Sequence, residues 1–155
     1  MSHEDYIRIA IRISEENMEE GGGPFGAVIV KDDEIIARAG NTVTPFNDPT
    51  AHAEINAIRK AASYLKNFDL SGSVLYSSCE PCPMCLGAIY WARLDGVYFA
   101  AEREDAKDAG FDDSFIYKEI QKPFQRRSIQ TIQMLRSEAY EVLKKWKGKD
   151  DKIQY

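Results

Sequence analysis

The sequence has no apolar run long enough to span a membrane, and residues 1–5, MSHED, lack the apolar core of a signal peptide. We therefore expect a cytoplasmic protein. Internal repeats, low-complexity tracts and linkers are also missing. At 155 residues, the chain is long enough to bury roughly two thirds of its unfolded surface. We expect a single domain over residues 1–155.

Positive charge is scarce: the chain has 20 Lys and Arg but 25 Asp and Glu, which gives a formal net charge of −5. Proteins that bind nucleic acid usually carry a basic surface, so we expect no nucleic-acid partner. The charge is uneven, since the segment from Lys118 to Lys152 has ten basic and five acidic residues. A solvated helix face is the main interpretation of this segment, and an RNA contact is the alternative.

Cysteine and histidine are rare, with three and two residues, and four of these five fall between residues 52 and 85. The motif His52-Ala53-Glu54 is followed by Pro81-Cys82-Pro83-Met84-Cys85. One imidazole and two thiolates make three ligands for zinc and leave the fourth tetrahedral position open for water, as in catalytic sites. The pattern H-x-E followed by P-C-x-x-C is the signature of zinc-dependent nucleobase deaminases.

Hydrolytic deamination explains these residue types. A zinc ion lowers the pKa of its bound water from about 15.7 to about 7, and protons must then move to a ring nitrogen and to the departing ammonia. Glu54 lies next to a ligand, is not itself one, and is placed to carry those protons. Both motifs precede predicted helices, at residues 53–65 and 83–93, where the positive end of the helix dipole favours thiolates.

The third cysteine leaves an alternative open. Cys79, Cys82, Cys85 and His52 could close a structural Cys3His site, although Glu54 would then have no role. A disulfide is less expected, because cysteines at three-residue spacing in an unsecreted chain indicate metal binding. We expect Cys79 to pack behind the site as a small apolar side chain.

Hydrophobic periodicity predicts alternating helices and strands. We expect helices at 6–18, 53–65, 83–93 and 137–146, and strands at 25–31, 34–40, 73–77 and 96–101. Strands separated by helices imply an α/β fold, a three-layer α/β/α sandwich with a central mixed sheet. In such sheets ligands gather at strand ends and helix N-termini, where both metal motifs fall.

Other segments add a family resemblance. Residues 22–30, GGPFGAVIV, and 47–54, NDPTAHAE, resemble the purine-acting branch of the cytidine deaminase-like superfamily. Residues 109–120, AGFDDSFIYKEI, and the terminal Tyr155 are similar to the small bacterial guanine deaminases. The resemblance runs from about Tyr6 to Tyr155 and is weakest between Pro123 and Asp150.

The resemblance implies one zinc ion per subunit, with His52, Cys82 and Cys85 as ligands and Glu54 as the proton carrier. It also implies five contacts to a purine base. These are Phe25 stacking on the ring, Asn41 hydrogen-bonding its edge, Trp91 closing a pocket wall, Asp113 accepting from guanine N–H groups, and Tyr155 capping the site.

The chemistry supports Asp113, because guanine presents N1–H and an exocyclic amine as neighbouring donors, which a carboxylate accepts strongly. Without the resemblance, other interpretations of the five residues stay open. Phe25 and Trp91 could be core residues, Asn41 could end a strand in a turn, Asp113 could cap a helix starting near Ser114, and Tyr155 could be a disordered last residue.

We therefore expect hydrolysis of guanine at C2 to xanthine and ammonia, in purine catabolism or salvage. The same chemistry on guanosine, an aminotriazine such as ammeline, cytosine or tRNA adenosine is the nearer alternative. The other alternative is not an enzyme: a non-catalytic module that binds a structural zinc ion or a nucleotide. The resemblance further implies a homodimer whose C-terminal segment, residues 148–155, crosses to the neighbouring subunit. The polar run at 147–152 would fit such an arm or a frayed tail.

Overall fold

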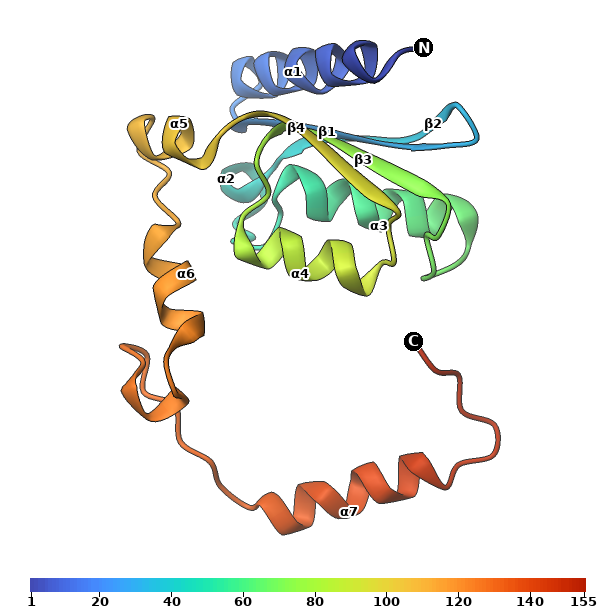
Figure 1. The fold of residues 1–155 in the computed structure, drawn as a ribbon, viewed down its shortest axis with the longest axis vertical. Helices are drawn as coiled ribbons and strands as arrows, with labels where there is room; N and C mark the ends of the chain where they lie inside the picture. Colours follow the sequence, from blue (N-terminus) through green and yellow to red (C-terminus); the bar gives the residue numbers. More distant parts are fainter. The chain divides into compact units, whose positions relative to one another are not determined.

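A four-stranded sheet forms the centre of the segment Met1–Asp113 (Figure 1). This computed structural model describes residues 1–155. The strands are β1 (Gly23–Lys31), β2 (Glu34–Asn41), β3 (Ser73–Cys79) and β4 (Gly96–Ala101), in the spatial order β2-β1-β3-β4. β1 is antiparallel to β2 and β3, whereas β3 and β4 are parallel. The expected mixed sheet is confirmed.

Helices cover both faces of this sheet. α1 (His3–Glu19) lies on one face, and α3 (Ala53–Leu65) and α4 (Pro83–Trp91) lie on the other (Figure 1). α1 begins with a capping box, in which Ser2 and Asp5 each satisfy a backbone N–H of the other. The three-layer α/β/α arrangement predicted from the sequence is therefore correct.

Two apolar clusters hold the helices to the sheet. Side chains alternate between the two faces along a strand, so neighbouring residues of β1 belong to different clusters. Val28 packs with Tyr6 of α1, while Ile29 belongs to the cluster that includes Ala57 of α3 and Ile89 of α4. Because both faces of β1 are covered, residues 26–30 are buried without a break. This double coverage explains the continuous apolar run in the sequence.

The chain divides into two compact units, Met1–Asp113 and Ser114–Tyr155, and the single domain expected from the sequence stays a prediction. The second unit contains α6 (Ser114–Gln121), the short 3-10 helix η1 (Phe124–Arg126) and α7 (Arg136–Lys147). None of its residues is buried, so it has no core of its own. Its exposed apolar side chains include Ile129, Ile132, Met134, Leu135, Val142 and Leu143.

The long helices and the strands agree with the sequence-based prediction, whereas the shortest helices are not predicted. The helix predicted at 53–65 has those bounds as α3. The sequence predicts none of α2 (Val43–Phe46), α5 (Arg103–Asp108) and η1, which have four, six and three residues. Such lengths are too short to show a hydrophobic period. No helix combines the length and the apolar character needed to cross a lipid bilayer.

Candidate active site

The two metal motifs lie at the N-termini of two helices on the same face of the sheet. His52 is the N-cap of α3 and Cys82 is the N-cap of α4, both in extended backbone conformation. Neither side chain forms a capping hydrogen bond to its own helix. Pro83 opens α4, where its missing N–H would be unpaired in any case. Cys85 follows in the first turn of α4, so the helix starts bring all three donors together.

The distances between the three donors fit one zinc ion. Nδ1 of His52 lies 3.5 Å from Sγ of Cys82 and 3.5 Å from Sγ of Cys85, and the two sulfurs are 3.5 Å apart. Zinc bonds of about 2.3 Å to sulfur and about 2.0–2.1 Å to nitrogen, at tetrahedral angles, put such donors about 3.5–3.8 Å apart. His52, Cys82 and Cys85 could therefore hold one zinc ion, and these three ligands would leave its fourth tetrahedral position open.

The close approach of the donors shifts their pKa values. The hydrogen bond between Cys82 and Cys85 is the main cause that lowers the pKa of the Cys82 thiol to about 4. The same hydrogen bond, followed by burial, raises the pKa of Cys85. The hydrogen bond with Cys82 raises the pKa of His52. Because a zinc-binding cysteine is a thiolate, binding of the ion would require Cys85 to lose its proton.

Cys79 does not belong to the group of possible ligands. Its Sγ lies 3.8 Å from the carbonyl oxygen of Glu102. Burial raises the pKa of Cys79 to about 11, so the side chain stays a neutral thiol near neutral pH. The alternative Cys3His site that includes Cys79 is therefore not formed, and Cys79 is buried as a small side chain.

Glu54 lies beside the metal ligands and is almost completely buried, with 6% of its surface exposed. One carboxylate oxygen accepts a hydrogen bond from Oγ of Ser77 at 3.2 Å, and the other lies 3.5 Å from Sγ of Cys85. Burial is the main cause that raises the pKa of Glu54. A carboxyl group whose pKa moves toward neutral can both accept and release a proton during a reaction.

The carboxyl group of Glu54 lines a pocket of about 340 Å³. This volume is at the lower end of the range for small-molecule sites. The pocket lies within the first unit. Six of the residues predicted from the sequence line it: Phe25, Asn41, His52, Glu54, Cys82 and Asp113.

Phe25 and Phe111 form an aromatic wall of the pocket. Their ring centroids are 4.9 Å apart and the rings meet edge to face, at 83°. This geometry is favourable for two aromatic rings and restrains both. The position of Phe25 is compatible with the predicted stacking on a base.

Asn41 is the last residue of β2, is 8% exposed, and lines the pocket. Its Oδ1 accepts a hydrogen bond from the backbone N–H of Val43 at 3.1 Å. This contact is the strand-ending turn that the sequence left open as an alternative. The two interpretations are therefore compatible, because one side chain both ends the strand and faces the pocket.

Asp113 also lines the pocket. Burial, followed by the charge of Cys82, raises the pKa of its carboxyl group. α6 begins at the next residue, Ser114, so the alternative role as a helix cap stays open.

Two predicted contact residues are not among the pocket-lining residues. Trp91 ends α4 and is 69% exposed. Tyr155 is the last residue of the second unit and is 71% exposed. Their roles at the substrate stay predictions.

The pocket also contains residues to which the sequence assigns no role, among them Glu80, Arg103, Ala106 and Phe111. The backbone N–H of Arg103 donates to a carboxylate oxygen of Glu80 at 3.2 Å. No motif marks Arg103, which comes from the short helix α5. Phe111 lies inside the segment 109–120, so the family resemblance is the signal that could have found it.

Comparison with known proteins places this site in a family. Residues 1–101 match the model of the cytidine and deoxycytidylate deaminase zinc-binding region. The guanine deaminase of Bacillus subtilis (strain 168) is 53% identical over 156 residues, covering 100% of both chains. The X-ray structure of guanine deaminase from Bacillus subtilis matches with a TM-score of 0.97 and 53% identity, covering 100% of this chain and 99% of that one.

A tRNA-specific adenosine deaminase matches a smaller part of the chain. The tRNA-specific adenosine deaminase of Aquifex aeolicus (strain VF5) is 43% identical over 101 residues, covering 65% of this chain and 67% of the relative. The match to this relative is therefore shorter than the match to the guanine deaminase of Bacillus subtilis.

Proposed function

This chain belongs to the cytidine and deoxycytidylate deaminase family, and we propose that it hydrolyses guanine at C2 to xanthine and ammonia. One observation carries the proposal. Asp113, an acceptor suited to guanine N–H groups, lines the same pocket as His52, Cys82 and Glu54. A guanine bound by the carboxylate of Asp113 therefore lies in the same pocket as the carboxylate of Glu54. The full-length match to guanine deaminase supports the same substrate.

The buried carboxylate of Glu54 carries the proton transfers. A zinc ion held by His52, Cys82 and Cys85 supplies, when bound, a water whose pKa is lowered to about 7. Glu54 takes a proton from the attacking water and passes protons to the ring nitrogen beside C2 and to the departing amine. The C2–O bond forms, the C2–N bond breaks, and ammonia leaves. Ser77 holds one oxygen of Glu54 in place through its hydroxyl group.

The remaining pocket residues bind and orient the base. Phe25 supplies an aromatic face, Asn41 hydrogen-bonds the purine edge, and Asp113 accepts from guanine N–H groups. Adenine and cytosine have no ring N–H next to their exocyclic amine, so neither presents guanine's pair of neighbouring donors, and a carboxylate at Asp113 disfavours both. Trp91 and Tyr155 complete the enclosure in this proposal, which excludes water from the bound base.

A substrate panel tests the proposed function. The purified, zinc-loaded protein is incubated separately with guanine, guanosine, cytosine and adenosine, and the products are separated by chromatography. We expect xanthine from guanine and no uracil or inosine, because Asp113 selects the N–H edge of guanine. Xanthosine from guanosine in place of xanthine from guanine would move the proposal to the nucleoside. Uracil or inosine as the main product would overturn it.

We further propose that the protein is a homodimer in which residues 148–155 cross to the neighbouring subunit and Tyr155 caps the pocket there. The support comes from the second unit, which exposes many large apolar side chains and has no buried residue. A segment of that length does not bury enough surface to be stable alone, so a second copy of the chain is the proposed cover. The cytoplasmic location expected from the sequence also stays a prediction.

Deletion of residues 150–155 tests the arm. We expect kcat/KM for guanine to fall by at least about tenfold, because the pocket loses its closure and admits water. Circular dichroism and zinc content of the truncated protein serve as controls for folding. Unchanged kcat/KM would contradict a role of the tail in the site.

Complementation between the truncated chain and a variant without a metal ligand separates a crossing arm from one that closes its own pocket. The truncated chain is co-expressed with full-length His52→Ala, which retains the tail and lacks a metal ligand. In a crossing dimer the truncated chain's pocket receives the tail of its partner, and activity returns. If activity does not return although the mixed dimer forms, the tail serves its own chain.

A further inference from the structure

Two asparagines outside the pocket hold the backbone around Asn41 from opposite sides. Asn17 lies on α1 and Asn56 lies on α3, and neither lines the pocket. Both donate hydrogen bonds to the chain at the end of β2, where Asn41 is placed. The position of a side chain is set by the backbone that carries it, so these contacts bear on the geometry of base recognition.

Asn17 binds the carbonyl group of Asn41 itself. Its Nδ2 donates to the carbonyl oxygen of Gly23 at 2.7 Å and to that of Asn41 at 2.8 Å. Glycines surround this amide. A Cβ atom at Gly22 would lie 2.4 Å from Nδ2 of Asn17, and one at Gly40 would lie 2.1 Å from its Oδ1. A side chain at either position would therefore collide with the amide of Asn17 unless that amide moved.

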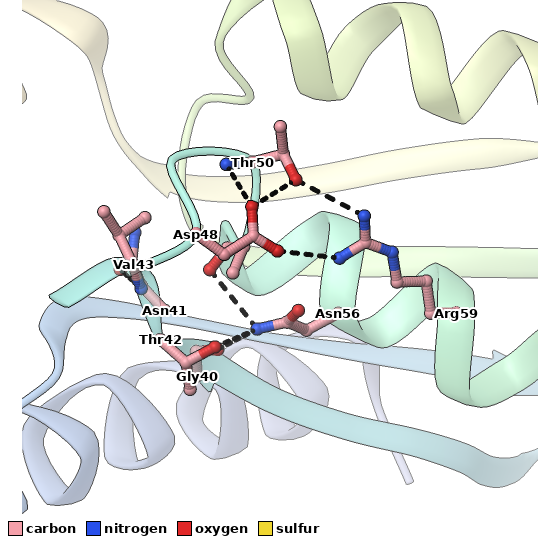
Figure 2. Close-up of polar contacts among 9 residues, drawn as sticks. Gly40, Asn41, Thr42, Val43, Asp48, Thr50, Asn56 and Arg59 are labelled. Carbon is pink, nitrogen blue, oxygen red and sulfur yellow. Dashed lines mark hydrogen bonds and ion pairs between the residues drawn. The ribbon is translucent and has the colours of Figure 1, made fainter. Parts of the chain in front are cut away.

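Asn56 binds the residues on either side of Asn41. Its Nδ2 lies 3.0 Å from the carbonyl oxygen of Gly40 and 2.9 Å from Oγ1 of Thr42. Figure 2 shows Asn56 pointing from α3 toward this end of the strand. A third acceptor, the carbonyl oxygen of Ala51, lies at 3.3 Å. Since an amide nitrogen has two hydrogens, these three acceptors satisfy it fully.

Asn56 also connects this strand end to the metal ligand. It lies one helical turn after His52, and its backbone N–H donates to the carbonyl oxygen of His52 at 2.9 Å. Ala51, which precedes His52, is bound by the side chain of Asn56 and by the backbone N–H of Thr42, at 2.9 Å for the latter. The side chain of Asn56 thus binds both the segment that carries Asn41 and the segment that carries His52.

We propose that Asn17 and Asn56 are positioning residues that hold the amide of Asn41 at a fixed place relative to His52, and so set the affinity for the base. The inference rests on the guanine deamination proposed above and adds two residues to it. Neither asparagine touches the substrate. Both act through Asn41, by fixing the position of its side chain. A displacement of about 1 Å in a positioned group can cost about a hundredfold in rate.

Amide hydrogen exchange at Val43 tests the proposal without any substrate. This N–H is accepted by Oδ1 of Asn41, so its exchange rate reports how firmly that side chain is held. In zinc-loaded Asn56→Ala we expect exchange at Val43 to rise about fivefold or more, the effect of losing one ordinary hydrogen bond. Exchange in the buried part of β3 should stay unchanged. An unchanged rate at Val43 would overturn the inference whatever the substrate is.

Steady-state kinetics with guanine supply the second readout. We expect Asn56→Ala to raise KM about tenfold, with kcat within about threefold of the wild-type value and zinc content unchanged. In an Asn41→Ala background the same substitution should have no further effect on KM, because the two residues act as one unit. Additive effects would overturn the inference, since a general loss of structure does not depend on Asn41.

The matched control is Lys60→Ala. Lys60 also lies on α3 and also binds β2, through a hydrogen bond of 2.9 Å from Nζ to the carbonyl oxygen of Arg38, which lies three residues before Asn41 in the strand. We expect this variant to leave KM and the exchange of Val43 unchanged. If Asn56→Ala does not fold, Asn56→Ser retains one donor and should give a smaller change in the same direction. Faster exchange at Val43 without any turnover of guanine would refute the proposed function and not the positioning.

Discussion

The Glu54→Gln variant is expected to retain one zinc ion per subunit and to lose between about a hundredfold and ten-thousandfold of its kcat for guanine. Proton transfer by a positioned side chain contributes a factor of that size, and an amide cannot carry the proton. The substitution preserves the shape of the side chain and leaves His52, Cys82 and Cys85 in place. Metal analysis and single-turnover kinetics on the same sample measure both quantities.

Glu104→Gln is the control for this experiment. Glu104 lies in the first turn of α5, is exposed, and does not line the pocket. It should leave kcat unchanged. If Glu54→Gln turned guanine over at the rate of the wild type, Glu54 would not be the proton carrier. Loss of zinc together with activity would instead assign Glu54 a role in holding the metal.

Asp113→Ala is expected to lower kcat/KM for guanine by about a hundredfold or more. A site that hydrogen-bonds specific groups of its substrate discriminates by large factors, and Asp113 is the proposed acceptor for guanine N–H groups. Burial, followed by the charge of Cys82, raises the pKa of its carboxyl group, as expected of a group that faces the pocket. Steady-state kinetics with guanine measure the effect.

Thermal unfolding separates substrate binding from helix capping at Asp113. A cap substitution costs about 0.5–2 kcal/mol of stability and would lower the melting temperature with little effect on kinetics. We expect the opposite balance, with a large kinetic change and a small change in melting temperature. Asp108→Ala, at the exposed end of α5, removes the same charge and should change neither. Unchanged kinetics in Asp113→Ala would return this residue to a capping role.

The parts of the site that follow local rules can be predicted from the sequence. His52 falls at a helix N-terminus because the apolar period of α3 begins directly after it, and Cys82 directly precedes the apolar helix α4. Pro83 reinforces the second start. The three metal ligands and the carboxylate all lie at the N-terminus or in the first turn of α3 or α4. Their spacing along the sequence therefore predicts that His52, Glu54, Cys82 and Cys85 come together.

Other parts depend on contacts between segments that are distant in sequence. α2 and α5 are too short to show a period, and α5 carries Arg103 to the pocket without any motif. Phe111 gains its place from an edge-to-face contact with Phe25, 86 positions earlier in the chain. Asn17 and Asn56 look like ordinary polar helix residues until the glycines and carbonyl groups around them are placed. The sequence therefore predicts the chemistry better than it predicts the walls of the pocket.

The fate of the oxygen atom tests the central claim, hydrolytic deamination of guanine at C2, most directly. Zinc-loaded protein is given guanine in water enriched in oxygen-18, and the product is analysed by mass spectrometry while ammonia is measured in parallel. The account predicts xanthine that carries one oxygen-18 atom at C2 and one ammonia for each xanthine. Guanine recovered unchanged, or ammonia released without labelled xanthine, would contradict it.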